Sequence, residues 1–159
     1  MPEITLEKLG ARTLAGYYKV SITEDQRRYV GMHKTRLISR TLASFGKAKI
    51  WVILREGEVC GYLGMWIDPK IDQFTIAPFI IDRHFQRSGI GRAALQLACE
   101  KLFDAGAQQV RLAVHPENEG AIAFYEQEGF RFTGAVWGAG DKVMTLEKDT
   151  SGENGSSGV

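Results

Sequence analysis

The middle of the chain changes its hydrophobic pattern within a few residues. Phe74 to Ile81 is a run of β-branched and aromatic residues, which is typical of a buried strand. From Ala93 to Leu102, alanine and leucine recur at helical spacing. The pattern therefore predicts a strand over Phe74 to Ile81, followed by a helix from about Gly89 to Asp104 that ends at Gly106. Pro78 cannot donate a ladder hydrogen bond, so it predicts a bulge in that strand.

The N-terminal part of the chain alternates weakly and then becomes helical in pattern. Residues 3–8 predict a strand at the sheet edge, and 11–45 carry apolar residues spaced as two amphipathic helices. Two apolar runs, Lys49 to Leu54 and Glu58 to Trp66, flank a short turn that contains glycine. They predict a hairpin.

The C-terminal part predicts a strand, a helix and a second hairpin. Gln109 to Val114 reads as the strand, and Asn118 and Gly129 read as the cap and the stop of the helix. Phe130 to Trp137 and Lys142 to Glu147 predict the final hairpin. We therefore expect one domain over 1–148 and a disordered, Gly/Ser-rich tail over 149–159.

Composition narrows the class of protein. The 159 residues are 44% hydrophobic and 25% charged, and the net charge of +1 does not favour a nucleic-acid partner. The charged N-terminus does not resemble a signal peptide, and no apolar stretch is long enough to span a membrane, so we expect a cytoplasmic protein with no membrane partner. Cys60 and Cys99 are expected to be reduced, although counting alone leaves one disulfide open.

The turn before the central helix has the features of a phosphate-binding site. In Gln86-Arg87-Ser88-Gly89-Ile90-Gly91, two glycines remove Cβ atoms where backbone would approach a ligand. The first N–H groups of the helix and its dipole favour an anion, and nearby arginines add positive charge. A plain Gly-containing turn remains the alternative.

Two other phosphate-binding motifs do not fit this stretch. A dinucleotide fingerprint needs its first glycine tight against the strand, but Arg83 to Ser88 intervene, and no acidic residue ends the next strand at Val114. The chain also contains no GxxxxGK[ST] sequence.

The QxxGxG pattern between a strand and a long helix resembles the acetyl-CoA-binding motif of the GNAT superfamily of N-acetyltransferases. The stretch from Asn118 to Phe130, NEGAIAFYEQEGF, resembles the second signature of that family. The resemblance implies an α/β (α+β) fold, with a mixed, mostly antiparallel central sheet flanked by helices. It also implies a bulged, splayed strand that receives acetyl-CoA.

The resemblance also implies the site residues. Tyr125 would be the general acid, and a backbone N–H of Phe79 or Ile80 would polarise the thioester carbonyl. The residues expected to bind acetyl-CoA are Phe79, Ile80, Ile81, Gln86, Arg87, Ser88, Gly89, Ile90, Gly91, Arg92, Asn118 and Ala121. Packing for Tyr125 and helix capping for Asn118 are the alternative roles.

The general base does not follow from the motif: Asp72, Glu24 or a water chain are the candidates. The histidines at 33, 84 and 115 lack metal-ligand spacing, so no metal is expected.

The acceptor is expected to be a small primary amine. IIDRHFQRSGIGRAAL and the helix signature resemble the bacterial diamine and spermidine/spermine acetyltransferases, although Ala77 and Pro78 stand where those enzymes usually carry Trp and Arg. A polyamine would need carboxylates, and the basic residues between Arg27 and Arg40 would repel it if they faced the acceptor, a direction that helical phase does not settle. The candidate carboxylates are Glu24, Asp25, Asp68 and Asp72. Amino-acid, peptide or aminoglycoside amines, a non-catalytic acetyl-CoA sensor, and a homodimer all stay open.

Overall fold

The computed structural model describes residues 2–30 and 33–149. The strands are β1 (Ile4–Lys8), β2 (Ala48–Arg55), β3 (Glu58–Asp68), β4 (Gln73–Ile81), β5 (Gln109–Val114), β6 (Arg131–Trp137) and β7 (Asp141–Glu147). The helices are α1 (Leu14–Lys19), α2 (Glu24–Arg27), α3 (Lys34–Leu42), the 3₁₀ helix η1 (Pro69–Ile71), α4 (Ile90–Asp104) and α5 (Glu119–Gln127). The tail predicted to be disordered lies, from residue 150 on, outside the described residues.

The strands form one sheet in the order β1-β2-β3-β4-β5-β7-β6. β4 and β5 are parallel, and the other described neighbours are antiparallel. β4 runs into α4 and the chain returns as β5, which is the crossover that a parallel pair requires. The expected mixed, mostly antiparallel sheet flanked by helices is confirmed.

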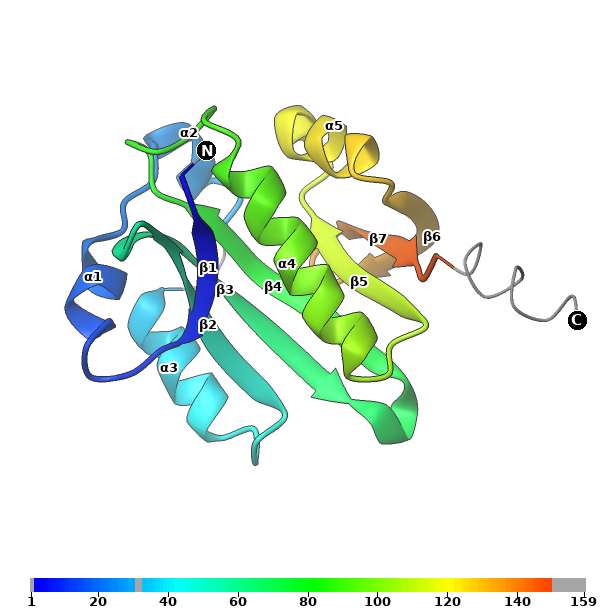
Figure 1. Cartoon of the computed structure of the whole chain (residues 1–159). Coiled ribbons are helices and arrows are strands. Elements are labelled where there is room, and N and C mark those ends of the chain that lie inside the picture. Colours follow the sequence, from blue (N-terminus) through cyan, green and yellow to red (C-terminus); the bar gives the residue numbers. More distant parts are fainter. Residues whose placement is uncertain (1, 31–32, 150–159) are drawn as a thin grey trace, which may run out of the picture.

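Helices cover both faces of the sheet (Figure 1). On the face that carries α4, Leu63, Phe74 and Ile76 pack with Ala94 and Ala98 in the larger apolar core. α1 and α3 cover the opposite face of the N-terminal half, in a second, smaller core. Alternate residues of β2 enter the two cores, because successive strand side chains point to opposite faces of the sheet.

The predicted bulge lies in β4. The register between β3 and β4 shifts between Leu63 and Met65, opposite Ala77 and Pro78. β4 and β5 pair at Thr75 and Arg111, and no pairing is formed further along the two strands. The parallel strands therefore diverge toward their carboxyl ends, as Figure 1 shows, and leave a gap in the sheet.

The predicted segment 11–45 differs from the structure in its number of helices. It contains three short helices instead of two. The extra helix is α2, and Thr23 is its N-cap. The Thr23 hydroxyl accepts a hydrogen bond from Gln26 N, and Thr23 N donates to the Gln26 side chain. This reciprocal capping box lets a helix of four residues form where periodicity alone predicts a longer one.

Candidate functional site

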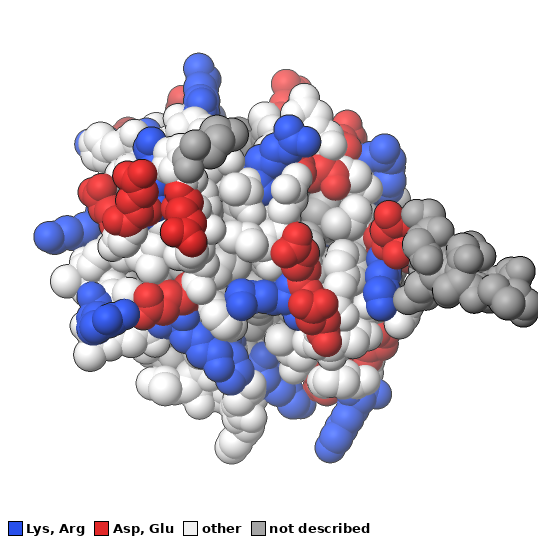
Figure 2. Space-filling view, in the orientation of Figure 1, with Lys and Arg blue, Asp and Glu red and all other residues white. Residues whose placement is uncertain are grey.

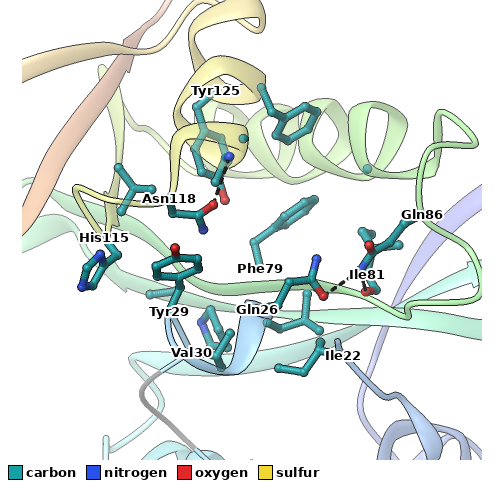
Figure 3. A pocket seen from close by; sticks show the side chains of 18 of the residues that line it. Ile22, Gln26, Tyr29, Val30, Phe79, Ile81, Gln86, His115, Asn118 and Tyr125 are labelled. Atoms are coloured by element: carbon teal, nitrogen blue, oxygen red, sulfur yellow. Dashed lines mark hydrogen bonds between the residues drawn. The ribbon is translucent and has the colours of Figure 1, made fainter. Parts of the chain in front are cut away.

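A cavity of about 990 Å³ lies where β4 and β5 diverge. One wall is the bulged half of β4, from Ala77 to Ile81, and another is the end of β5 with His115. The turn before α4 and the first turns of α5 line one end of it, and residues between Ile22 and Val30 line the other (Figure 3). The gap in the sheet therefore connects the predicted phosphate turn to the N-terminal helices.

The turn before α4 has the backbone geometry of an anion site. Arg87 and Gly89 have positive φ angles of 63° and 82°, and Gly89 is the N-cap of α4. A Cβ at Gly89 would meet no atom within 4 Å. The first N–H groups of α4 lack intrahelical partners and face a cavity with space for a phosphate.

The positive charge of this turn is partly compensated. Arg92 Nε lies 3.1 Å from Glu128 Oε1, and Gln96 Nε2 donates to the other oxygen of the same carboxylate. Both Arg87 and Arg92 line the cavity. Charged side chains of both signs occur side by side over this face of the molecule (Figure 2). An anion at this turn would therefore depend largely on the backbone N–H groups.

Most of the residues that the sequence predicts to bind acetyl-CoA line the cavity. Two of them do not line it: Ser88, whose hydroxyl donates to the Phe85 carbonyl, and Ile90, whose side chain is buried in the larger core. The general acid suggested by the sequence, Tyr125, lines the cavity as well. The suggested acetyl-CoA residues that line it are Phe79, Ile80, Ile81, Gln86, Arg87, Gly89, Gly91, Arg92, Asn118 and Ala121.

Tyr125 and Asn118 reach the cavity from α5 (Figure 3). Tyr125 is 9% exposed and packs edge-on against Phe130, so it also belongs to the core. Burial raises the pKa of the Tyr125 hydroxyl above its usual value, so the phenol is protonated at neutral pH. Asn118 Oδ1 caps α5 by accepting from Ala121 N, which leaves its amide nitrogen toward the cavity.

Sequence reasoning missed the residues that line the other end of the cavity. Gln26, Tyr29 and His115 come together there from α2, the turn after it, and the end of β5. The Tyr29 and His115 rings lie 5.0 Å apart, although 86 positions separate them in the sequence. The Thr23-x-x-Gln26 capping box is the one local signal that could have located this segment.

The carboxylates suggested for a polyamine lie elsewhere. Glu24, Asp25, Asp68 and Asp72 do not line the cavity. Asp68 instead pairs with Lys47 at 2.9 Å, and the hydrogen bond from Lys47 helps to lower the pKa of the Asp68 carboxyl. Asp141, Glu128 and one of the basic residues between 27 and 40, Arg40, do line the cavity.

A buried carboxylate fastens the N-terminal helices to the β4–α4 loop. Asp82 accepts from Ser21 N and His84 N, both at 2.8 Å, and Arg83 N donates to the Ser21 carbonyl. Burial raises the pKa of Asp82, but the hydrogen bonds from His84 and Ser21 outweigh it and hold the pKa below its usual value. The segment that carries Gln26 and Tyr29 is thereby held against the cavity.

The described part of the chain offers no other cofactor or membrane feature of the kinds below. No group of three or more His, Cys, Asp or Glu side chains gathers there as metal ligands do. No helix there combines the length and apolarity needed to cross a membrane. Cys60 and Cys99 are both buried and free, as expected.

Comparison with known proteins identifies a family whose model matches most of the chain. The model of the acetyltransferase (GNAT) family matches residues 16–130. A probable spermine N(1)-acetyltransferase from Bacillus subtilis subsp. natto is 28% identical over 99 residues, 58% of this chain and 65% of that protein. The [ribosomal protein bS18]-alanine N-acetyltransferase of Escherichia coli is 37% identical over 60 residues, 38% of this chain and 40% of that protein. The chain thus spans less than two thirds of the length of these relatives.

Solved structures share the fold across nearly the whole chain. The PaiA N-acetyltransferase from Thermoplasma acidophilum, in complex with coenzyme A, aligns with a TM-score of 0.68 at 17% identity, covering 92% of this chain and 99% of that one. The ribosomal-protein-S18-alanine N-acetyltransferase from Escherichia coli aligns with a TM-score of 0.67 at 23% identity, covering 96% and 98%.

Proposed function

The chain belongs to the acetyltransferase (GNAT) family, and we propose that it moves the acetyl group of acetyl-CoA to a primary amine in the cavity between β4 and β5. The observation that carries this proposal is the geometry of the gap. Unpaired N–H groups at the start of α4 stand at one end of it, and Tyr125 lines the same cavity. A phosphate site and a proton donor therefore share one continuous space.

Acetyl-CoA supplies an activated acetyl group as a thioester. The pyrophosphate would lie on the N–H groups after Gly89, and the pantetheine arm would pass between the diverging strands. Asn118 would donate to that arm through the amide nitrogen that its capping role leaves available. A backbone N–H of Phe79 or Ile80 would polarise the thioester carbonyl at the bulge.

The chemical step forms a C–N bond and breaks the C–S bond. The attacking amine must be neutral, so its ammonium form first gives up one proton to solvent. The nitrogen loses a second proton to water as the C–N bond forms, and this proton restores Tyr125 after Tyr125 has protonated the thiolate. The departing thiolate takes a proton from Tyr125 Oη. Because burial raises the Tyr125 pKa, the phenol retains its proton until the thiolate forms. Neither Asp72 nor Glu24 lines the cavity, which favours a water chain as the path for the amine proton.

Two classes of acceptor have support. The name of the Bacillus relative favours a diamine or polyamine. The name of the Escherichia coli relative favours the amine of a protein N-terminus. The position of Arg40 in the cavity wall, and of the suggested carboxylates outside it, favours the second class. Two carboxylates do line the cavity, but Glu128 already pairs with Arg92. The cationic Arg40 opposes a polyamine, which carries several positive charges, more strongly than a peptide N-terminus, which carries one.

The test is release of coenzyme A thiol from acetyl-CoA in the presence of spermidine, putrescine, amino acids, short peptides and aminoglycosides. An amine-free reaction measures background hydrolysis, and calorimetry measures acetyl-CoA binding separately. We expect thiol release above background with at least one amine. Binding of acetyl-CoA without release for any amine would contradict the enzyme and support a sensor of acetyl-CoA.

A further inference from the structure

Gln26 holds its side-chain amide in a defined orientation inside the cavity. Gln86 Nε2 donates to the carbonyl oxygen of Ile81 at 3.1 Å, and a carbonyl can only accept. This bond identifies the nitrogen end of the Gln86 amide. The same nitrogen donates to Gln26 Oε1 at 2.9 Å (Figure 3). Gln26 must therefore turn its oxygen toward Gln86.

A second donor confirms that orientation. Thr23 N donates to Gln26 Oε1 at 3.2 Å within the capping box of α2. A backbone N–H can only donate. If the Gln26 amide were flipped, both hydrogen bonds would be lost, and its NH2 group would face the two donors Thr23 N and Gln86 Nε2. The Gln26 oxygen is thus fully engaged. Its amide nitrogen lies toward the cavity near Phe79, and has no hydrogen-bond partner within the described part of the chain.

We infer that Gln26 is a specificity residue that donates a hydrogen bond to a carbonyl oxygen beside the acceptor amine. The acceptor class is then an α-amino amide: an amino-acid amide or the N-terminus of a peptide. This inference rests on the proposed acetyl transfer and adds the acceptor class to it. Gln26 comes to the cavity from α2, on its N-terminal side, and contacts the edge of the phosphate turn through Gln86, while its amide nitrogen lies toward the cavity.

The chemistry of the amide nitrogen separates this class from polyamines. An N–H group needs an acceptor, and a peptide N-terminus carries a carbonyl oxygen three bonds from its amine nitrogen. A polyamine brings further N–H donors, which oppose the N–H groups of Gln26 and find no acceptor in them. A preorganised donor also costs little ordering entropy when the acceptor binds, because Gln86 and Thr23 already fix the side chain.

The sharpest variant is Gln26→Glu. A glutamate keeps the length of the side chain and an oxygen that accepts from Gln86 and Thr23, so the positioning of α2 is preserved. It replaces the free N–H donors with a carboxylate oxygen that repels a carbonyl and attracts a cation. Gln108→Glu makes the same change of charge on an exposed side chain at the opposite end of β5 from His115 and serves as the matched control.

The experiment measures kcat/KM for alanyl-alanine amide and for spermidine, with acetyl-CoA affinity measured by calorimetry in every variant. We expect the natural protein to prefer the dipeptide amide. Gln26→Glu should lower kcat/KM for the dipeptide amide by about tenfold or more, which is the scale of one lost hydrogen bond plus repulsion, and raise the relative rate with spermidine. Acetyl-CoA affinity should stay unchanged, and Gln108→Glu should behave like the natural protein.

Several outcomes overturn the inference. One is a natural protein that prefers spermidine, and another is an unchanged preference in a folded Gln26→Glu variant. Weaker acetyl-CoA binding in that variant would instead assign Gln26 to the pantetheine arm. If Gln26→Glu does not fold, Gln26→Met, which removes the donor without adding charge, must show the same loss with the dipeptide amide. If no amine raises thiol release above background, the proposed function itself is refuted. If only spermidine does so, only the acceptor class is refuted.

Discussion

Gly64→Ala tests whether the β3 backbone sets the width of the gap. Gly64 lies opposite the bulge, and a Cβ there would stand 2.4 Å from the Ala77 carbonyl oxygen. Real Cβ atoms do not approach other atoms closer than 3.0 Å, so the two backbones would have to separate by roughly 0.6 Å. Overpacking of this kind typically costs about 1–3 kcal/mol of folding free energy.

The expected result is a lower melting temperature. For a chain of this length, 1 kcal/mol corresponds to about 2–4 °C, so Gly64→Ala should melt about 2–12 °C below the natural protein. Gly120→Ala is the matched control, because a Cβ at Gly120 in α5 meets no atom within 4 Å. Alanine favours a helix over glycine by about 0.5–1 kcal/mol, so this control should melt slightly higher.

The melting temperatures of both variants are measured by calorimetry, and acetyl-CoA binding is measured at a temperature below unfolding. The displaced Ala77 carbonyl belongs to the strand that lines the cavity, so acetyl-CoA should also bind more weakly to folded Gly64→Ala. A Gly64→Ala variant as stable as the natural protein would refute the close approach of β3 to the bulge.

Three further predictions concern the site. Gly89→Val should abolish acetyl-CoA binding, because it puts a side chain into the space expected for the phosphate. The φ angle of 82° at this position also costs a valine about 1–2 kcal/mol. Undiminished affinity in a folded variant, measured by calorimetry, would contradict phosphate binding at this turn. Tyr125→Phe should lower kcat about 100-fold or more with little change in acetyl-CoA affinity, and an unchanged kcat with chemistry rate-limiting would leave Tyr125 a packing residue. Asp82→Asn should lower the unfolding free energy by about 1–3 kcal/mol at pH 7, because the amide cannot accept all the bonds from Ser21 and His84. The pKa of Asp82 in the folded protein lies below that of an unfolded Asp, which is about 3.9. The contribution of Asp82 to the unfolding free energy is therefore complete at neutral pH, and it is lost as the pH falls below about 4 and through the lowered pKa. If the unfolding free energies of the variant and the natural protein do not converge in acid, this reasoning is wrong.

Local chemistry made much of the fold readable from the sequence. The change from strand to helical spacing located β4 and α4 to within a residue or two, because side-chain periodicity follows directly from backbone geometry. Asn118 and Gly129 marked the limits of α5, since capping and left-handed stops depend on single residues. Pro78 indicated the bulge for a similarly local reason, the missing N–H donor.

The second end of the cavity could not be read in this way. Periodicity over 11–45 predicted two helices, and the capping box at Thr23 and Gln26 instead produced a third, short one. That α2 faces the phosphate turn depends on the bond from Gln86 to Gln26, which joins residues 60 positions apart.

The sequence by itself determined the parts whose cause lies within one or two turns of chain: the strands, the main helices, their caps, and the glycine turn that favours a phosphate. Only the tertiary structure decided which side chains meet across the gap. It separated Ser88 and Ile90 from the cavity, paired Arg92 with Glu128, and placed Gln26, Tyr29 and His115 at the other end. The physical reason is that β4 and β5 diverge beyond Thr75, and the cavity is bounded by whatever the packing of distant segments brings to that opening. Such contacts depend on long-range burial and hydrogen bonding, which leave no periodic trace along the chain.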